Sequence, residues 1–204
     1  MRTLRHYIGW RLGLTAAETQ TTAAERDCLA RHAAGRGQLV EIGVWHGVTT
    51  KRLRTAMAAD GRLTAVDPFP KGRLGFSAAE RIAHQEVATV DNGRVRWMRA
   101  TGAAAAAGHA DVDFIFIDGD HSEEGLLADW TAWKGLVVPG GIVAIHDSRS
   151  TSDRQIDDAG SVKVTNRVIV RDPDFEVVEV VDSLTVVRRL PAPASSRMDK
   201  AAAR

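Results

Sequence analysis

The sequence predicts an α/β fold: a seven-stranded, mostly parallel sheet with helices on both faces and an antiparallel hairpin at the C-terminal end. Two observations lead to this prediction. Five short apolar runs alternate with helical patterns between Gln38 and Ile145, which is typical of parallel strands joined by helices. Two β-rich runs, Phe175–Val181 and Leu184–Arg189, then follow with only two residues between them, and so short a link permits only an antiparallel hairpin.

Length and composition narrow the class of protein. The 204 residues are enough for one domain with a sizeable core. The formal net charge is +1 and the charges are well mixed, so we expect no nucleic-acid partner. The single cysteine, Cys28, cannot form an internal disulfide, which fits a reducing compartment such as the cytoplasm. No continuous apolar stretch follows the N-terminus, so we expect neither a signal peptide nor a membrane span.

The two ends of the chain differ from the middle. Residues 1–21 form a lead-in in which Leu4, Ile8 and Leu12 could make a short helix. Thr22 to Glu25 form a capping box, which predicts a helix from there to Gly35. Residues 22–190 are expected to form the single domain. Residues 191–204 are polar and rich in Ala, Pro and Ser, which predicts a disordered tail.

The elements between these ends follow in order. The five predicted parallel strands are Gln38–Ile42, Arg62–Val66, Val95–Met98, Asp113–Ile117 and Ile142–Ile145, the last one preceded by Pro139-Gly140-Gly141. The predicted helices are Val48–Ala58, Ser77–Val90, Glu123–Leu136 and Val162–Val170, and Ala103–Ala107 is either a short helix or a turn. Two loops, 69–76 and 149–160, follow strand ends on the ligand side of the sheet, where a loop is either a lid or a plain surface excursion.

A glycine-containing turn follows the first strand. In Glu41-Ile42-Gly43-Val44-Trp45-His46-Gly47 the glycines allow a tight turn and close approach of the backbone to a ligand. The pattern is not the G-x-G-x-x-G of dinucleotide enzymes, because Trp45 stands at the second glycine. Asp67 ends the second strand and lies 20 residues beyond Gly47, the separation typical of an acid that binds ribose hydroxyls. Alternatively, Asp67 before Pro68 is a simple turn residue.

Two acidic clusters end the fourth and fifth strands. Asp118-Gly119-Asp120-His121 follows one strand and His146-Asp147-Ser148 follows the other, at the sheet edge where α/β proteins bind ligands. A carboxylate beside a buried apolar run needs a partner, which a metal ion, a ligand hydroxyl or a backbone amide could provide. The alternative is that these side chains only cap helices, as Asp120 or Ser122 could.

These motifs resemble a known family. The pattern Glu41-x-Gly43-x-x-x-Gly47, Asp67 at the end of the second strand and the terminal hairpin look like class I S-adenosylmethionine-dependent methyltransferases with a Rossmann-like fold, over about residues 39–190. Residues 117–125 and 139–148 resemble a small bacterial branch that includes metal-dependent sugar O-methyltransferases. Within it, composition and the His146-Asp147 ending look like the sugar 1-O-methyltransferases of methylmannose polysaccharide synthesis.

The resemblance implies roles for individual residues. For S-adenosyl-L-methionine it implies Glu41, Gly43 and Gly47 at the amino-acid end, Asp67 at the ribose, Thr101 and Gly102 near the adenine, and Asp118 beside the cofactor. For Mg²⁺ it implies Asp118, His146 and Asp147 as ligands. The branch carries two acids where this chain has His146 and Asp147, and an imidazole ligand shifts the preference towards Mn²⁺.

The expected reaction is methyl transfer to a hydroxyl of a small sugar, with the 1-OH of a methylmannose-type mannoside as the leading candidate. His121 and Asp120 are the candidate bases, and His121 is favoured because histidine titrates near neutrality. His121 could instead be a surface residue at the start of a helix. The alternatives are metal-independent methylation of an aryl hydroxyl or amine, and a non-catalytic module that binds S-adenosylmethionine. The lead-in and the exposed hairpin edge make a homodimer the expected assembly.

Overall fold

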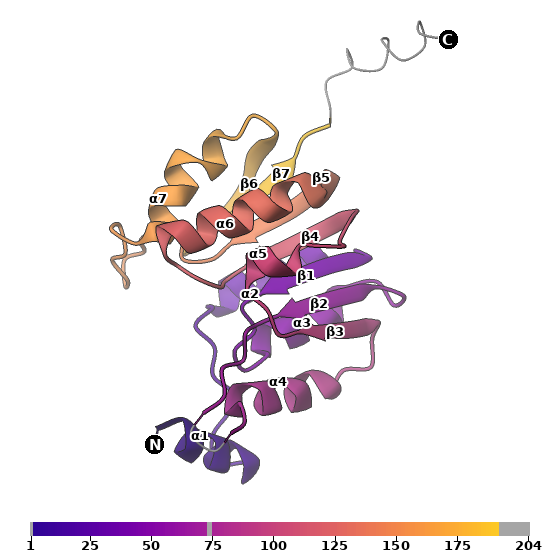
Figure 1. Cartoon of the computed structure of the whole chain (residues 1–204), viewed down its shortest axis with the longest axis vertical. Helices are drawn as coiled ribbons and strands as arrows, with labels where there is room; N and C mark the ends of the chain where they lie inside the picture. The colour runs from indigo at the N-terminus through magenta and orange to yellow at the C-terminus, as the bar shows by residue number, and fades with distance from the viewer. Residues whose placement is uncertain (1, 73–74, 192–204) are drawn as a thin grey trace, which may run out of the picture.

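The computed structural model describes residues 2–72 and 75–191, and its centre is a seven-stranded sheet (Figure 1). The strands are β1 (Gln38–Ile42), β2 (Arg62–Val66), β3 (Arg94–Met98), β4 (Val112–Ile117), β5 (Val137–Ile145), β6 (Phe175–Val181) and β7 (Leu184–Arg189). Their order is β3-β2-β1-β4-β5-β7-β6. Strands β1 to β5 are parallel, whereas β7 is antiparallel to both β5 and β6. The predicted fold class is confirmed.

Helices cover both faces of this sheet. They are α1 (Arg2–Arg11), α2 (Ala23–Ala33), α3 (Val48–Ala56), α4 (Ala78–Ala88), α5 (Gly102–Ala105), α6 (Glu123–Trp133) and α7 (Gly160–Arg167), with 3₁₀ turns at Lys134–Leu136 and Ile169–Arg171. Alternate side chains of β4 enter two cores: Ile115 and Ile117 pack with α6, while Phe114 and Phe116 pack with α2 and α3. Because both faces are buried, β4 is a continuous apolar run.

The lead-in of the chain forms a helix, as predicted. Helix α1 packs against α4 at the β3 end of the molecule, where Trp10 Nε1 donates a hydrogen bond to Glu86 Oε1 at 2.9 Å (Figure 1). The predicted capping box is also present: Thr22 caps α2 and the Glu25 carboxylate accepts from the Thr22 backbone N–H. No described helix is long and apolar enough to cross a membrane. The predicted tail, beyond residue 191, lies outside the described residues.

Several predicted boundaries were wrong. Strand β5 begins at Val137, so Pro139-Gly140-Gly141 lies inside the strand and not before it. A register shift between Val112 and Phe114 in the β4–β5 ladder, together with a positive φ of 80° at Gly140, accommodates these residues. The predicted helix Glu123–Leu136 ends at Trp133 and tightens into a 3₁₀ turn, and α7 begins at Gly160, two residues earlier than predicted.

Candidate active site

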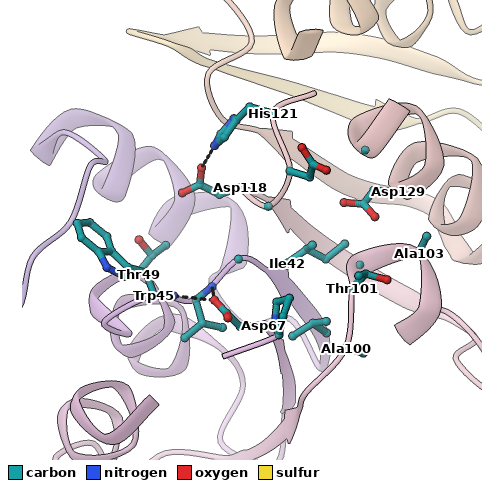
Figure 2. Close-up of a pocket in the computed structure, with 18 of the residues that line it drawn as sticks. Ile42, Trp45, Thr49, Asp67, Ala100, Thr101, Ala103, Asp118, His121 and Asp129 are labelled. Carbon is teal, nitrogen blue, oxygen red and sulfur yellow. Dashed lines mark hydrogen bonds and ion pairs between the residues drawn. The ribbon is translucent and has the colours of Figure 1, made fainter. Parts of the chain in front are cut away.

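A cavity of about 820 Å³ opens at the carboxyl ends of β1, β2 and β4 (Figure 2). That volume lies within the roughly 300–1,000 Å³ typical of small-molecule and cofactor sites. The predicted site residues that line it are Gly43, Asp67, Thr101, Gly102, Asp118, Asp120 and His121. Glu41, Gly47, His146 and Asp147 lie outside its walls. The lead-in also contributes, because Glu18, Thr19 and Gln20 form part of the wall.

Gly43 brings the turn after β1 against the end of β4. Its φ is +90°, and a Cβ on it would lie 2.0 Å from the Asp118 carbonyl oxygen, so no other residue fits without moving the backbone. Gly47 has a different part: a Cβ there would meet the Ala83 Cα at 2.9 Å, so this glycine lets α3 pack closely on α4. Gly43, and not Gly47, is therefore the glycine that lets the backbone come close at the cavity, here to the end of β4.

Asp67 organises the same turn. Its Oδ2 accepts from the backbone N–H groups of Val44 and Trp45, each at 3.0 Å, and its Oδ1 accepts from Phe69 N at 2.7 Å. Oδ2 uses both lone pairs on these two amides, but Oδ1 has a second lone pair free, so this acid can hold the loop and still accept from a ligand. The turn role and the ligand role, considered as alternatives from the sequence, are compatible.

Glu41 is buried beneath the cavity. Its side chain is fully buried, and neither carboxylate oxygen has a hydrogen-bond partner among the described residues. Burial raises the pKa of Glu41 well above its ordinary value, and the nearby Asp118 and Asp67 carboxylates raise it further. Burial and these two carboxylates therefore favour the protonated form of Glu41. Its predicted role at the amino-acid end of the cofactor remains a prediction.

His146 connects two acids in the interior. Its Nδ1 lies 2.8 Å from Asp118 Oδ1, its Nε2 lies 3.3 Å from Glu25 Oε2, and its side chain is only 1% exposed. The other Glu25 oxygen accepts from the Ser183 backbone N–H and hydroxyl at 2.9 and 2.7 Å. Burial alone would lower the pKa of His146, but the hydrogen bonds to Asp118 and Glu25 outweigh it and raise the pKa to about 10. His146 is thus a buried cation.

Glu25, on the other side of His146 from Asp118, is also held by several hydrogen bonds. Burial raises the pKa of Glu25, yet the hydrogen bonds from His146, the Thr22 backbone and Ser183 together lower it to about 2. The sequence identified Glu25 only as part of a capping box. Its Oε2 contacts both the Thr22 backbone N–H and His146, and its Oε1 accepts from Ser183, in the turn before β7.

His121 lies between the acids that end β4 and β5. Its Nε2 is 3.6 Å from Asp118 Oδ1 and its Nδ1 is 3.7 Å from Asp147 Oδ2, and the side chain is 41% exposed (Figure 2). Asp147 is also held on its other oxygen, because Arg154 Nη1 lies 2.5 Å from Asp147 Oδ1. The 149–160 loop therefore folds back onto the site through Arg154.

The described arrangement does not fit the metal ion that the resemblance implies. Asp118 and Asp147 already face imidazoles: their Oδ1 atoms lie 2.8 and 3.7 Å from His146 Nδ1, and His121 lies between the two carboxylates. A metal ligand must offer a free lone pair, and His146 directs its two ring nitrogens at Asp118 and Glu25. Arg154 already compensates the charge of Asp147. His146 and Arg154 thus supply positive charge beside these acids.

Asp120, the other candidate base, is bound locally. Its Oδ1 accepts from the Ser122 backbone N–H at 2.8 Å, and this bond lowers the pKa of Asp120. A lower pKa makes a carboxylate a weaker base, so of the two predicted candidates His121 is better suited to accept a proton. The capping alternative also holds in part, because Ser122 caps α6 through Gly125 N.

Asp129 also lines the cavity, although it belongs to none of the motifs identified in the sequence. This acid lines the cavity from α6, is 5% exposed, and has its pKa raised to about 6 by burial. A signal was present in the sequence: Asp129 belongs to the helical stripe of Leu126, Trp130 and Trp133, which faces the core. A charged residue on such a stripe indicates either a buried partner or a ligand.

A family model described as a methyltransferase domain matches residues 40–148, more than half of the chain. The chain belongs to this methyltransferase family. Tricin synthase 1 of Oryza sativa subsp. japonica is 27% identical over 178 residues, which cover 77% of this chain and 68% of the rice protein. The expected enzyme class, an S-adenosylmethionine-dependent O-methyltransferase, is confirmed, whereas the sugar-specific branch stays a prediction.

Solved structures share the fold at lower identity. The O-methyltransferase TomG of Streptomyces achromogenes, involved in tomaymycin synthesis and solved with S-adenosylmethionine, has a TM-score of 0.62 at 16% identity and covers 94% of this chain and 91% of its own. A protein of Corynebacterium glutamicum has a TM-score of 0.65 at 19% identity, with coverages of 95% and 90%. Identities this low show the fold alone, which confirms the expected Rossmann-like methyltransferase fold.

Proposed function

We propose that this methyltransferase transfers the methyl group of S-adenosylmethionine to a hydroxyl of a small sugar or glycoside, with His121 as the general base. The observation that carries the proposal is the imidazole of His121 in the cavity wall, between the carboxylates of Asp118 and Asp147. When bound, the cofactor supplies a methyl group on positively charged sulfur. The site must supply alignment of the hydroxyl and a place for its proton.

The chain's own residues account for both needs. The Gly43 turn, held by Asp67, fixes one wall of the cavity, and alignment of two reactants is worth up to about 7–11 kcal/mol. As the acceptor oxygen bonds to the methyl carbon, the carbon–sulfur bond breaks and its electrons stay on sulfur. The hydroxyl proton goes to a ring nitrogen of His121. Asp118 and Asp147 then stabilise the imidazolium, as carboxylates beside a catalytic histidine do.

The polar surroundings of His121 support a sugar as acceptor. Asp118, Asp120 and Glu124 line the cavity with it and can accept hydrogen bonds from hydroxyls. Arg73, in the 69–76 loop, lies outside the described residues. A mannoside 1-OH remains the leading candidate within this class, on the sequence resemblance.

One observation favours a second candidate, an aryl hydroxyl. Trp45 lines the cavity and is 38% exposed, so a flat ring has a surface on which to stack. The same His121 chemistry serves either acceptor.

The test is a screen of the purified chain with methyl-labelled S-adenosylmethionine against small glycosides, phenols and amines, each with and without excess EDTA. We expect a glycoside to be the fastest acceptor and EDTA to leave the rate unchanged, because Asp118 is paired with His146 and Asp147 with Arg154. A phenol that reacts much faster than every glycoside favours the second candidate. Loss of activity in EDTA, restored by Mg²⁺ or Mn²⁺, would show that the reaction depends on a divalent metal ion.

A further inference from the structure

Asp129 lines the cavity from α6 and is held by the backbone N–H of Ala103, at the start of α5. A Cβ on Gly102 would lie 2.4 Å from Asp129 Oδ1, whereas a Cβ on Gly119 would lie 3.6 Å from Oδ2, an ordinary contact. The carboxylate therefore fits against the loop after β3 only because position 102 carries no side chain. Figure 2 shows Asp129 on the side of the cavity that holds Thr101 and Ala103, away from Trp45 and Thr49.

This carboxylate is poorly compensated in the described residues. Burial raises its pKa to about 6, and the group that lowers it is the backbone N–H of Ala103; no cation does. Trp130 and Trp133 beside it are fully buried in the core, so the packing of α6 does not depend on the charge of Asp129. An acid that costs burial energy and lines a cavity points to a hydrogen-bond donor on the ligand.

The layout of the cavity identifies that donor. The methyl group must lie near His121, and the ribose near Asp67, so the base of the nucleoside falls at the remaining end, beside residues 100–103. We propose that Asp129 accepts a hydrogen bond from the exocyclic amine of the cofactor's adenine and selects adenine against bases that lack this amine. The inference rests on the proposed function, since it concerns the same cavity.

Replacement of Asp129 by Asn gives a specific expectation. Asparagine has nearly the same shape, and its side chain can present an amide N–H₂ in place of an acceptor. Hypoxanthine carries a carbonyl oxygen where adenine carries the amine. The wild type should therefore bind S-adenosylhomocysteine about ten- to a hundredfold more tightly than S-inosylhomocysteine, the range for a hydrogen bond to a charged group. Asp129→Asn should abolish or reverse that preference.

The measurement is calorimetric titration of the full chain at pH 8 with both nucleosides. Asp129→Ala is the second variant and should lose the preference without reversing it. Glu123→Gln is the matched control, because it removes an acid from the same helix at an exposed position outside the cavity, and it should keep the wild-type ratio. Thermal melting checks that each variant folds.

The outcomes separate the inference from the function. A wild-type ratio below about threefold, or an Asp129→Asn variant that weakens both ligands equally, overturns the inference and leaves Asp129 as a support for the β3 loop. Wild-type protein that binds S-inosylhomocysteine as tightly as S-adenosylhomocysteine also overturns it. Failure of the wild type to bind S-adenosylhomocysteine at all would overturn the proposed function instead.

Discussion

Replacing His146 with glutamine should destabilise the fold by several kcal/mol. The imidazole is the cation shared by Asp118 and Glu25, and its side chain is 1% exposed. Removing one member of a buried charged pair costs about 3–5 kcal/mol, because the other charge is left uncompensated. The pKa gives a similar figure: a rise from 6.5 to about 10 corresponds to roughly 5 kcal/mol of stabilisation of the charged ring.

The pH dependence of this effect has a definite sign. The folded pKa of His146 is above its ordinary value, so its contribution is complete below pH 6.5 and is lost as the pH rises towards 10. The folded pKa of Glu25 is lowered from 4.5 to about 2, so its contribution is present above pH 4.5 and is lost as the pH falls towards 2. Between pH 6.5 and 10 the difference in stability between wild type and His146→Gln should shrink by about 1.4 kcal/mol per unit.

Urea unfolding followed by tryptophan fluorescence at pH 6, 7.5 and 9 measures this difference. His32→Gln is the matched control, because His32 pairs with Glu179 at 2.9 Å in a half-exposed place. Such a pair is worth about 1 kcal/mol or less. The reasoning fails if His146→Gln costs no more than the control at pH 6, or if its cost is the same at pH 6 and pH 9.

Three further predictions concern the cavity. Asp67→Ala should weaken S-adenosylhomocysteine binding at least tenfold in calorimetry, because it frees the turn and removes an acceptor worth about 1.5–3 kcal/mol; unchanged affinity would contradict this. Gly43→Ala should abolish that binding, since its Cβ would meet the Asp118 carbonyl, whereas Gly135→Ala, with nothing within 4 Å, should leave it intact. His121→Ala should lower kcat about 10²–10⁴-fold with little change in KM, and a variant of normal kcat would exclude it as the base.

The sequence predicted the sheet well because both faces of its central strands are buried. Strands β1 and β2 were placed at the right residues, since their apolar runs are bounded by turn residues. The start of β5 was missed for a physical reason. Pro139 and the two glycines after it are typical of a turn, and only the register shift against β4 keeps them in the strand. Such a shift depends on the neighbouring strand and is not a local signal.

The candidate site was predictable where its parts are contiguous. The turn from Glu41 to Gly47 and the two acidic strand ends are local patterns, and the cavity lies at that edge of the sheet. The contact between Glu25 and His146 joins residues 121 positions apart, and nothing in a capping box indicates that the capping oxygen Oε2 also meets a distant histidine. Asp129 differs, because its place on the apolar stripe of α6 was readable from the sequence.

This chain has His146 where the branch that it resembles carries an acid, and this affects how the charge of the site depends on pH. A divalent ion holds its charge across the neutral range, whereas an imidazole holds it only while its pKa stays above the ambient pH. Here the two carboxylates that flank His146 raise its pKa to about 10, so its charge is as constant near neutrality as that of an ion. His121 has no such enclosure: it is 41% exposed and at least 3.6 Å from either acid. The two histidines therefore differ in setting, since His146 is enclosed by its acids and holds Asp118 in place, whereas His121 faces the cavity, where the proposed function assigns it the role of base.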